Sequence, residues 1–139
     1  MKNEPLVIER TYDAPVGKVW AALTDPEKMK QWYFDLPDFK PEVGTMFTFE
    51  AGSETKQYLH ECIVTKSIEN KIIAYTWRYP EVEGNSEVSF ELFEDGSKTR
   101  LVLTHTGLET FPQTGDYARE NFVGGWTHFT VALDNFLAK

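Results

Sequence analysis

The sequence predicts an α+β fold in which a curved, antiparallel six-stranded sheet wraps around a long C-terminal helix, with two short helices after the first strand. Three observations predict this fold class. The expected elements follow the order strand, two helices, five strands and one long helix. The connections between the later strands are short, which is typical of an antiparallel meander. The last element carries its apolar residues on one face, and a sheet is the partner large enough to bury that face.

A strand and two short helices are expected first. The segment Leu6–Tyr12 is rich in β-branched and aromatic residues, which favours a strand. Pro15 suits the first turn of a helix, because a backbone N–H is not needed there. The apolar stripe of that helix is formed by Val16, Val19, Trp20 and Leu23. Asp25 is expected to cap a second helix that has Pro26 at its first position and ends near Tyr33.

Five further strands and the long helix are expected next. Period-two alternation and turn residues predict strands at Met46–Ala51, Gln57–Ser67, Ile72–Tyr79, Ser86–Glu94 and Thr99–Thr106. The segment Asp95–Ser97 is a hairpin signal between the last two of them. A helix is expected from about Tyr117 to Ala138, because apolar residues recur there at three- and four-residue steps. These residues are Phe122, Trp126, Phe129, Leu133, Phe136 and Leu137.

The composition of the chain narrows the classes of function. Its 139 residues fit a single domain over residues 1–139. The net charge of −8 argues against nucleic acid and against an anionic membrane surface, which both need clustered Lys and Arg. Membrane insertion is not expected, because no apolar run is long enough and no signal peptide opens the sequence. Cys62 is the single cysteine, so no intrachain disulfide can form and a reducing, cytoplasmic location fits.

A hollow between the sheet and the long helix is the candidate site. Aromatic residues make up 14% of the chain, and ligand pockets are mostly apolar and aromatic. Strand parity indicates which side chains face this hollow. The expected pocket wall is Trp77, Phe90, Leu103, Phe122, Trp126 and Phe129. The expected orienting groups are Tyr58, His60, Tyr75 and His105. The alternative interpretation is that these rings simply pack against one another as core.

No catalytic residue, metal site or cofactor is expected. The histidines are isolated, and no group of His, Cys, Asp and Glu has the spacing of metal ligands. The sequence has no Gly-x-Ser-x-Gly elbow and no glycine-rich phosphate loop. Cys62 has no basic neighbour and lies in a strand, where thiols are usually inert. A lone histidine in an apolar row, such as His105, is more often a hydrogen-bonded core residue than a catalyst. His128 is expected to point away from the Trp126 ring, toward the side of the helix or solvent.

Two adjacent glycines interrupt the long helix. Each of Gly124 and Gly125 costs about 1 kcal/mol relative to alanine in a helix interior. The favoured interpretation is that the helix approaches the sheet or the Trp20 helix closely at this point, or bends there. The alternative is that the weakened helix acts as the gate of a cavity.

Five segments of the chain, in order, resemble one protein family. They are Asp13–Pro26 followed by Trp32, Pro41–Gly44 with Phe47, Tyr75–Trp77, Thr99–Gly107 and Gly124–Trp126. Together they resemble proteins similar to the homologue of the heat-shock-protein ATPase activator, in the START-like or SRPBCC superfamily. The resemblance covers nearly the whole chain and implies the helix-grip fold. It does not imply one activity, because the superfamily includes lipid carriers, hormone receptors, polyketide cyclases and co-chaperone domains.

Three functions follow as hypotheses. The first is a protein that binds a small apolar molecule, such as a lipid, an aromatic polyketide or a flavonoid-like compound, in the hollow. The second is an enzyme of cyclase or hydrolase type, in which His105 or Tyr75 would move protons. The third, which the family resemblance alone suggests, is a module that interacts with a chaperone through an exposed apolar patch. The candidates for that patch are Phe34, Leu36 and Phe39, which alternatively cap the mouth of the cavity.

Overall fold

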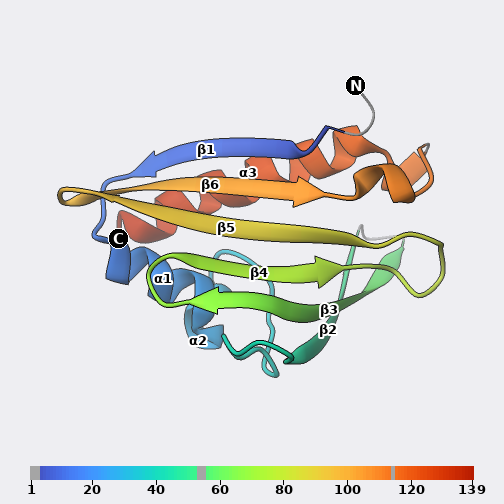
Figure 1. Cartoon of the computed structure of the whole chain (residues 1–139), viewed down its shortest axis with the longest axis horizontal. Coiled ribbons are helices and arrows are strands. Elements are labelled where there is room, and N and C mark those ends of the chain that lie inside the picture. Colours follow the sequence, from blue (N-terminus) through green and yellow to red (C-terminus); the bar gives the residue numbers. More distant parts are fainter. Residues whose placement is uncertain (1–3, 53–55, 114) are drawn as a thin grey trace.

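A curved antiparallel sheet and a long C-terminal helix form the architecture of the protein (Figure 1). The structure is a computed structural model that describes residues 4–52, 56–113 and 115–139. Its elements are β1 (Leu6–Tyr12), α1 (Val16–Thr24), α2 (Pro26–Met29), β2 (Met46–Gly52), β3 (Gln57–Ile68), β4 (Ile72–Trp77), β5 (Ser86–Asp95), β6 (Lys98–Thr106), the 3₁₀ turns η1 (Leu108–Thr110) and η2 (Gly115–Tyr117), and α3 (Arg119–Leu137).

The six strands lie in the order β1-β6-β5-β4-β3-β2, and every neighbouring pair is antiparallel. Strands β2 to β6 form the expected meander, because each pairs with the next along the chain. The first strand reaches the far side of this meander and pairs with β6, with Leu6 opposite His105 and Tyr12 opposite Thr99. The two short helices make this crossing possible. The predicted fold class is therefore confirmed.

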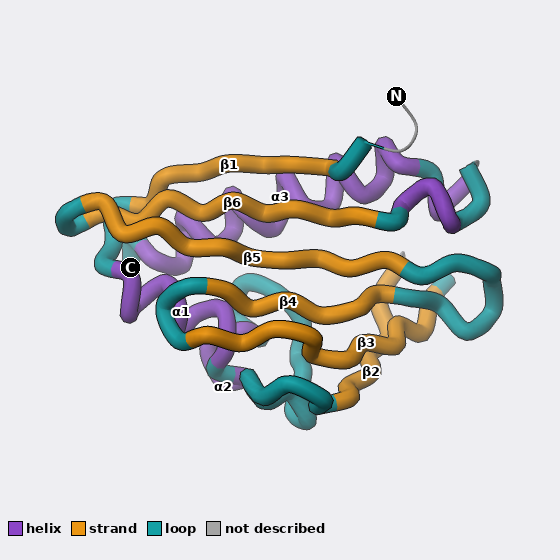
Figure 2. The backbone as a smooth tube through the Cα atoms, in the orientation of Figure 1, coloured by secondary structure: helices purple, strands orange, loops and turns teal. Residues whose placement is uncertain are grey.

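The helices are arranged against one side of the sheet. Figure 2 shows α3 running along the sheet behind β1 and β6, while α1 and α2 lie at the end of the sheet that carries the β3–β4 turn. The last turn of α3 reaches α1, where Lys18 Nζ donates to the Leu137 carbonyl at 2.8 Å. The chain thus holds α3 at its C-terminal end with α1 and along its length with the sheet.

Three predicted boundaries differ from the structure by two residues or more, and the others agree within one residue. The second helix ends at Met29 and continues to Tyr33 only as a turn, because the amides of Trp32 and Tyr33 both donate to the Met29 carbonyl. Strand β4 ends at Trp77, since Arg78 pairs with Glu61 as an isolated bridge instead of extending the ladder. The long helix begins at Arg119, after the separate 3₁₀ turn η2.

Candidate ligand-binding site

A cavity of about 540 Å³ opens between the N-terminal half of α3 and one end of the sheet. Its wall comes from the loop after α2, from β2 and β3, from the end of β4, from η2 and from α3. The residues that line it are Phe34, Ala51, Gly52, Tyr58, His60, Trp77, Tyr79, Tyr117, Asn121, Phe122, Gly125, Trp126, His128 and Phe129. Gly52, Asn121 and His128 are exposed and form the rim, whereas His60, Trp77 and Trp126 are buried.

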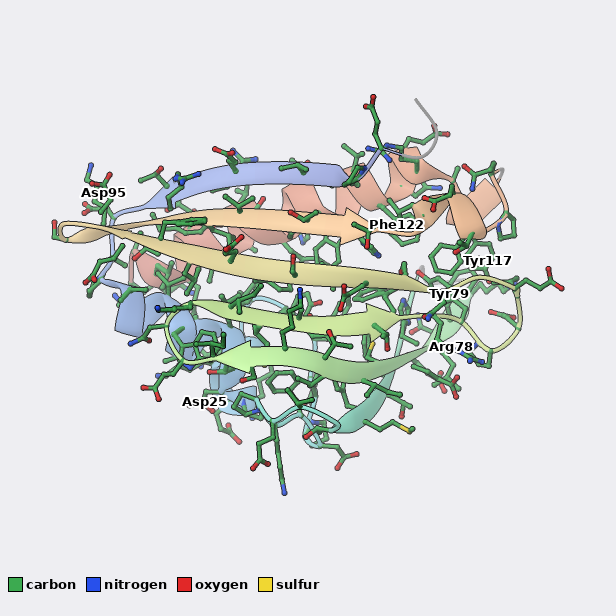
Figure 3. All side chains as sticks on the ribbon, in the orientation of Figure 1. Asp25, Arg78, Tyr79, Asp95, Tyr117 and Phe122 are labelled. Carbon is green, nitrogen blue, oxygen red and sulfur yellow. The ribbon has the colours of Figure 1, made fainter. Side chains whose placement is uncertain are left out.

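Helical and strand periodicity place these side chains on the cavity. Phe122, Trp126 and Phe129 recur at steps of four and three along α3, so they share one face of the helix. Tyr58 and His60 are two residues apart on β3 and therefore share one face of the strand. Figure 3 shows Tyr79, Tyr117 and Phe122 gathered at the same end of the sheet, away from Asp25 and Asp95.

Stacked rings make one wall of the cavity. The Phe34 ring lies 4.5 Å from the Phe49 ring and 4.9 Å from the Phe129 ring, centroid to centroid. The His60 imidazole also stacks on Phe49 at 4.4 Å, with an interplanar angle of 10°. Rings at these separations have favourable contacts beyond the burial of their area. The loop after α2 is thereby fixed onto β2 and α3.

His60 is a neutral hydrogen-bond acceptor in this wall. Its Nδ1 lies 2.8 Å from the Tyr58 carbonyl oxygen. Because a carbonyl oxygen can only accept, Nδ1 carries the ring proton, and Nε2 is left with a lone pair. Burial lowers the pKa of His60 to about 4, against the opposing effect of the carbonyls of Tyr58 and Phe49. The imidazole is therefore uncharged at pH 7.

Tyr79 supplies a neutral hydroxyl next to His60. The Trp77 Nε1–H donates to the Tyr79 hydroxyl oxygen at 2.9 Å. The His60 and Tyr79 ring centroids lie 4.7 Å apart. Burial raises the pKa of Tyr79 to about 12, although the bond from Trp77 opposes this. The hydroxyl consequently keeps its proton at pH 7.

Tyrosine rings crowd the outer part of the cavity. Tyr117 lies 4.9 Å from Tyr79 and 5.5 Å from Tyr58, centroid to centroid. Its hydroxyl donates to the Glu81 carboxylate at 3.1 Å. Lys56 Nζ stands 4.8 Å from the centroid of the Tyr58 ring, within the range of a cation–π contact. The short turn η2 therefore brings an aromatic side chain over the cavity entrance.

The structure brings together six of the ten predicted site residues. Those that line the cavity are Tyr58, His60, Trp77, Phe122, Trp126 and Phe129. That they bind a ligand stays a prediction. Residues that were not selected from the sequence also line it, among them Tyr79, Tyr117 and the rim residue His128. Tyr79 lies two residues after Trp77 and therefore points to the same side of the extended chain. The alternation that selected Trp77 could have selected Tyr79 as well.

Four predicted residues lie outside the cavity lining, namely Tyr75, Phe90, Leu103 and His105. The strand alternation correctly placed all four on the inner face of the sheet, because their side chains are buried. They lie at points along their strands where other side chains already fill the space between the sheet and the helices. The Tyr33 hydroxyl is 2.7 Å from the Tyr75 hydroxyl, and the Tyr33 ring lies 6.5 Å from Phe90 and 6.1 Å from Trp126. The loop after α2 therefore occupies the space that Tyr75 and Phe90 face, whereas His105 packs against the rings of Trp77 and Trp126.

His105 is a core residue with both ring nitrogens in use. The Trp126 Nε1–H donates to His105 Nδ1 at 2.9 Å, so the ring proton lies on Nε2. That nitrogen donates to Ser86 Oγ at 2.8 Å, and Ser86 Oγ donates to the Trp77 carbonyl at 2.7 Å. Burial, with a smaller effect of Arg119, lowers the pKa of His105 to about 3. The expectation that His105 orients a ligand or moves protons directly is therefore wrong.

The glycine pair in α3 does not mark a close approach to the sheet. A Cβ atom added at Gly124 or at Gly125 would meet no atom within 4 Å among the described residues. Gly125 faces the cavity, while Gly124 is exposed. The close-packing interpretation is wrong, because the helix passes over a hollow at this point. The gate interpretation stays a hypothesis.

The proposed apolar patch after α2 is not on the surface. Leu36 and Phe39 are only 1% and 2% exposed, and Phe39 packs on Phe47 at 5.1 Å between ring centroids. Phe34 lines the cavity instead. The interpretation of these three residues as an exposed interaction surface is therefore wrong, and only Phe34 fits the alternative of a cavity wall.

The cavity is lined by aromatic, small and uncharged polar residue types together with two histidines. No Lys, Arg, Asp or Glu side chain belongs to the described lining of the cavity. Cys62 is buried, and burial raises the pKa of its thiol. No cluster of three or more His, Cys, Asp and Glu among the residues the structure describes is placed to hold a metal ion. Within the described ranges, no helix has the length and apolarity needed to cross a membrane.

Comparison with solved structures supports the fold. A protein from Mesorhizobium loti is 28% identical, with a TM-score of 0.76 and 97% of each chain covered. A protein from Chromobacterium violaceum is 18% identical, with a TM-score of 0.83, and the match covers 100% of this chain and 99% of that one. DynU16, a protein of the dynemicin biosynthetic locus, is 20% identical with a TM-score of 0.77, covering 97% of this chain and 47% of its own.

The sequence comparison gives the family. A search of curated proteins gave no match. The family model described as Activator of Hsp90 ATPase homolog 1-like protein matches residues 13–138, which is nearly the whole chain. The helix-grip architecture agrees with the solved relatives of the START-like, or SRPBCC, type. The chain belongs to the family of Activator of Hsp90 ATPase homolog 1-like proteins.

Proposed function

We propose that the protein binds a small, uncharged and largely apolar molecule in the cavity between α3 and the sheet. The observation that carries this proposal is the lining of the cavity, which is mostly aromatic and has no Lys, Arg, Asp or Glu among its described residues. Burying a charge without a partner is costly, so such a lining selects against ions. The family supports the same conclusion at a coarser level, since SRPBCC proteins commonly bind hydrophobic ligands.

The size of the cavity suits a molecule of moderate size. Its volume of about 540 Å³ lies within the roughly 300–1,000 Å³ that small-molecule sites span. A ligand that buries about 250 Å² of apolar surface would gain about 6 kcal/mol before the costs of association. A micromolar Kd corresponds to about −8 kcal/mol, so apolar contact of this size has to be supplemented by ring–ring contacts and hydrogen bonds.

A relative suggests one kind of ligand. DynU16 shares the fold and comes from the dynemicin biosynthetic locus. An aromatic polyketide is consistent with the ring-lined cavity, and a lipid or a flavonoid-like compound is also compatible with its apolar character. The family description refers to an activator of a chaperone ATPase, but no observation on the described surface favours a chaperone as partner.

Blocking the cavity from the helix tests the proposal. Gly125→Leu places a side chain into open space within the cavity, whereas Gly124→Leu places the same side chain on the exposed neighbour. Binding is measured by the fluorescence of the uncharged probe N-phenyl-1-naphthylamine, with urea unfolding as a check on each variant. We expect Gly125→Leu to weaken probe binding at least tenfold and Gly124→Leu to leave it unchanged. Equal affinity of both variants and the parent protein would refute binding in this cavity.

A further inference from the structure

We propose that the ligand is a flat aromatic molecule that carries a hydroxyl group, with its rings between the aromatic walls and its hydroxyl held between His60 and Tyr79. This inference rests on the proposed binding function and names the class of ligand for the same cavity. Three features of the described lining support it. The wall consists of aromatic side chains, the indole N–H groups are already hydrogen-bonded within the protein, and two polar groups can still bond to a ligand.

The wall is made of rings and contains no branched aliphatic side chain among its described residues. No Leu, Ile, Val or Met belongs to the lining, although these residue types are common in the neighbouring core. Aromatic rings interact best with other rings in offset-stacked or edge-to-face geometry, with a gain beyond their buried area. The Phe129 ring already lies edge-to-face with Phe34 and tilted against Trp126, so these rings present faces and edges to an occupant. A flat aromatic molecule uses these surfaces, whereas a flexible saturated chain does not.

The polar edges of the indoles are turned inward to the protein. The Trp126 N–H is bound by His105, and the Trp77 N–H is bound by Tyr79. The chain from His105 through Ser86 to the Trp77 backbone carbonyl holds the His105 ring in place behind the Trp126 indole. Each indole therefore offers the cavity its apolar surface and no hydrogen-bond donor.

His60 and Tyr79 keep one hydrogen-bonding capacity each. His60 Nδ1 is used by the Tyr58 carbonyl, which leaves Nε2 as an acceptor. The Tyr79 oxygen accepts from Trp77, and the structure of the described residues gives its O–H no acceptor. One acceptor and one donor on adjacent rings, 4.7 Å apart between centroids, match a hydroxyl group. Such a hydroxyl donates to His60 Nε2 and accepts from Tyr79 O–H.

Three probes separate the parts of this inference. 2-Naphthol has flat rings and a hydroxyl, 2-methoxynaphthalene keeps the rings and the acceptor oxygen but lacks the donor, and 1-decanol has the hydroxyl on a saturated chain. Binding to the full chain is measured by calorimetry at pH 7. A net hydrogen bond of about 1 kcal/mol corresponds to about a fivefold preference. We expect 2-naphthol to bind about five times more tightly than 2-methoxynaphthalene and at least ten times more tightly than 1-decanol.

Variants assign the hydroxyl to the two residues. His60→Phe keeps a ring but removes the acceptor, so the preference for 2-naphthol over 2-methoxynaphthalene is expected to vanish. Tyr79→Phe removes the donor and is expected to weaken both naphthalenes by a similar factor. His128→Phe makes the same histidine change at the exposed rim and is expected to leave the preference intact. Thermal unfolding checks each variant, and His60→Phe carries the test alone if Tyr79→Phe, which deprives Trp77 of its acceptor, does not fold.

The outcomes separate this inference from the proposed function. Equal binding of 1-decanol and 2-naphthol overturns the aromatic class, and an unchanged preference in His60→Phe overturns the hydroxyl site. If N-phenyl-1-naphthylamine binds in the cavity while none of the three probes does, the inference is wrong and the binding function stands. If no probe binds, including N-phenyl-1-naphthylamine, both are wrong.

Discussion

The two halves of α3 have the same apolar period but different partners. The C-terminal half is docked: Tyr12 Oη donates to the Thr130 carbonyl at 2.9 Å, and Leu133 is 1% exposed. The N-terminal half passes over the cavity, and the space beside Gly125 holds no atom within 4 Å of a built Cβ. The helical pattern decides which side chains face inward. The elements opposite decide whether those side chains meet a packed core or a hollow.

The largest expected effect is a difference in the free energy of unfolding between variants in the two parts of α3. Leu133→Ala removes a fully buried side chain from the docked half, and we expect it to lower the free energy of unfolding by about 4 kcal/mol. Phe129→Ala removes a half-buried ring that borders an existing hollow, so about 2 kcal/mol is expected despite the larger side chain. Urea unfolding at pH 7 measures both. An equal or larger loss for Phe129→Ala would show that the part of α3 that borders the cavity is as closely packed as the docked part.

The next effect is a dependence of the free energy of unfolding on pH, caused by two histidines near the cavity. His60 and His105 have pKa values lowered to about 4 and about 3, mainly by burial, so the folded protein keeps them neutral. The unfolded chain protonates them near the ordinary histidine pKa of about 6.5. Their contribution to stability is therefore complete above pH 6.5 and is lost as the pH falls from 6.5 toward the folded values.

Acid unfolding measures this contribution. We expect the free energy of unfolding to fall by roughly 3 kcal/mol between pH 7 and pH 5 through these two residues. His105→Gln should be less stable at pH 7 and show a weaker dependence on pH over the same interval. Amide exchange adds the spatial test, because Trp126 contacts His105 and Leu133 lies in the docked half. Two results together would contradict the role of these histidines. Acidification would speed up amide exchange equally at Trp126 and Leu133, and His105→Gln would leave the dependence of the unfolding free energy on pH unchanged.

The smallest effect uses the glycine pair as a matched comparison. Gly124→Ala and Gly125→Ala should each stabilise the protein by about 1 kcal/mol, because alanine favours the helix interior and neither methyl group meets a neighbour. Only the methyl group at Gly125 enters the cavity, so it alone should reduce the affinity for N-phenyl-1-naphthylamine, by a small factor. Thermal unfolding and probe titration give the two quantities. Destabilisation by Gly125→Ala would mean that the helix approaches another element there.

The sequence predicted the fold and about half of the site for one reason. Strand parity and helix period are local, so they correctly assigned side chains such as Trp77, Phe122 and Tyr75 to the inner faces. They carry no information on how far along the strands the hollow extends. Tyr75 and Phe90 face inward where Tyr33 fills the space, whereas Tyr79 faces the cavity.

The amino-acid sequence by itself determined the order of the elements, the inner face of each, and the neutral, aromatic character of the interior, because these depend on neighbours within a few residues. The tertiary structure decided where the interior stays open. That choice depends on the loop after α2, which has no periodic pattern and whose rings Tyr33 and Phe34 insert between α3 and the sheet. It also decided which polar groups are free for a ligand, since the partners of His105 and Trp126 lie 19 and 21 residues away along the chain.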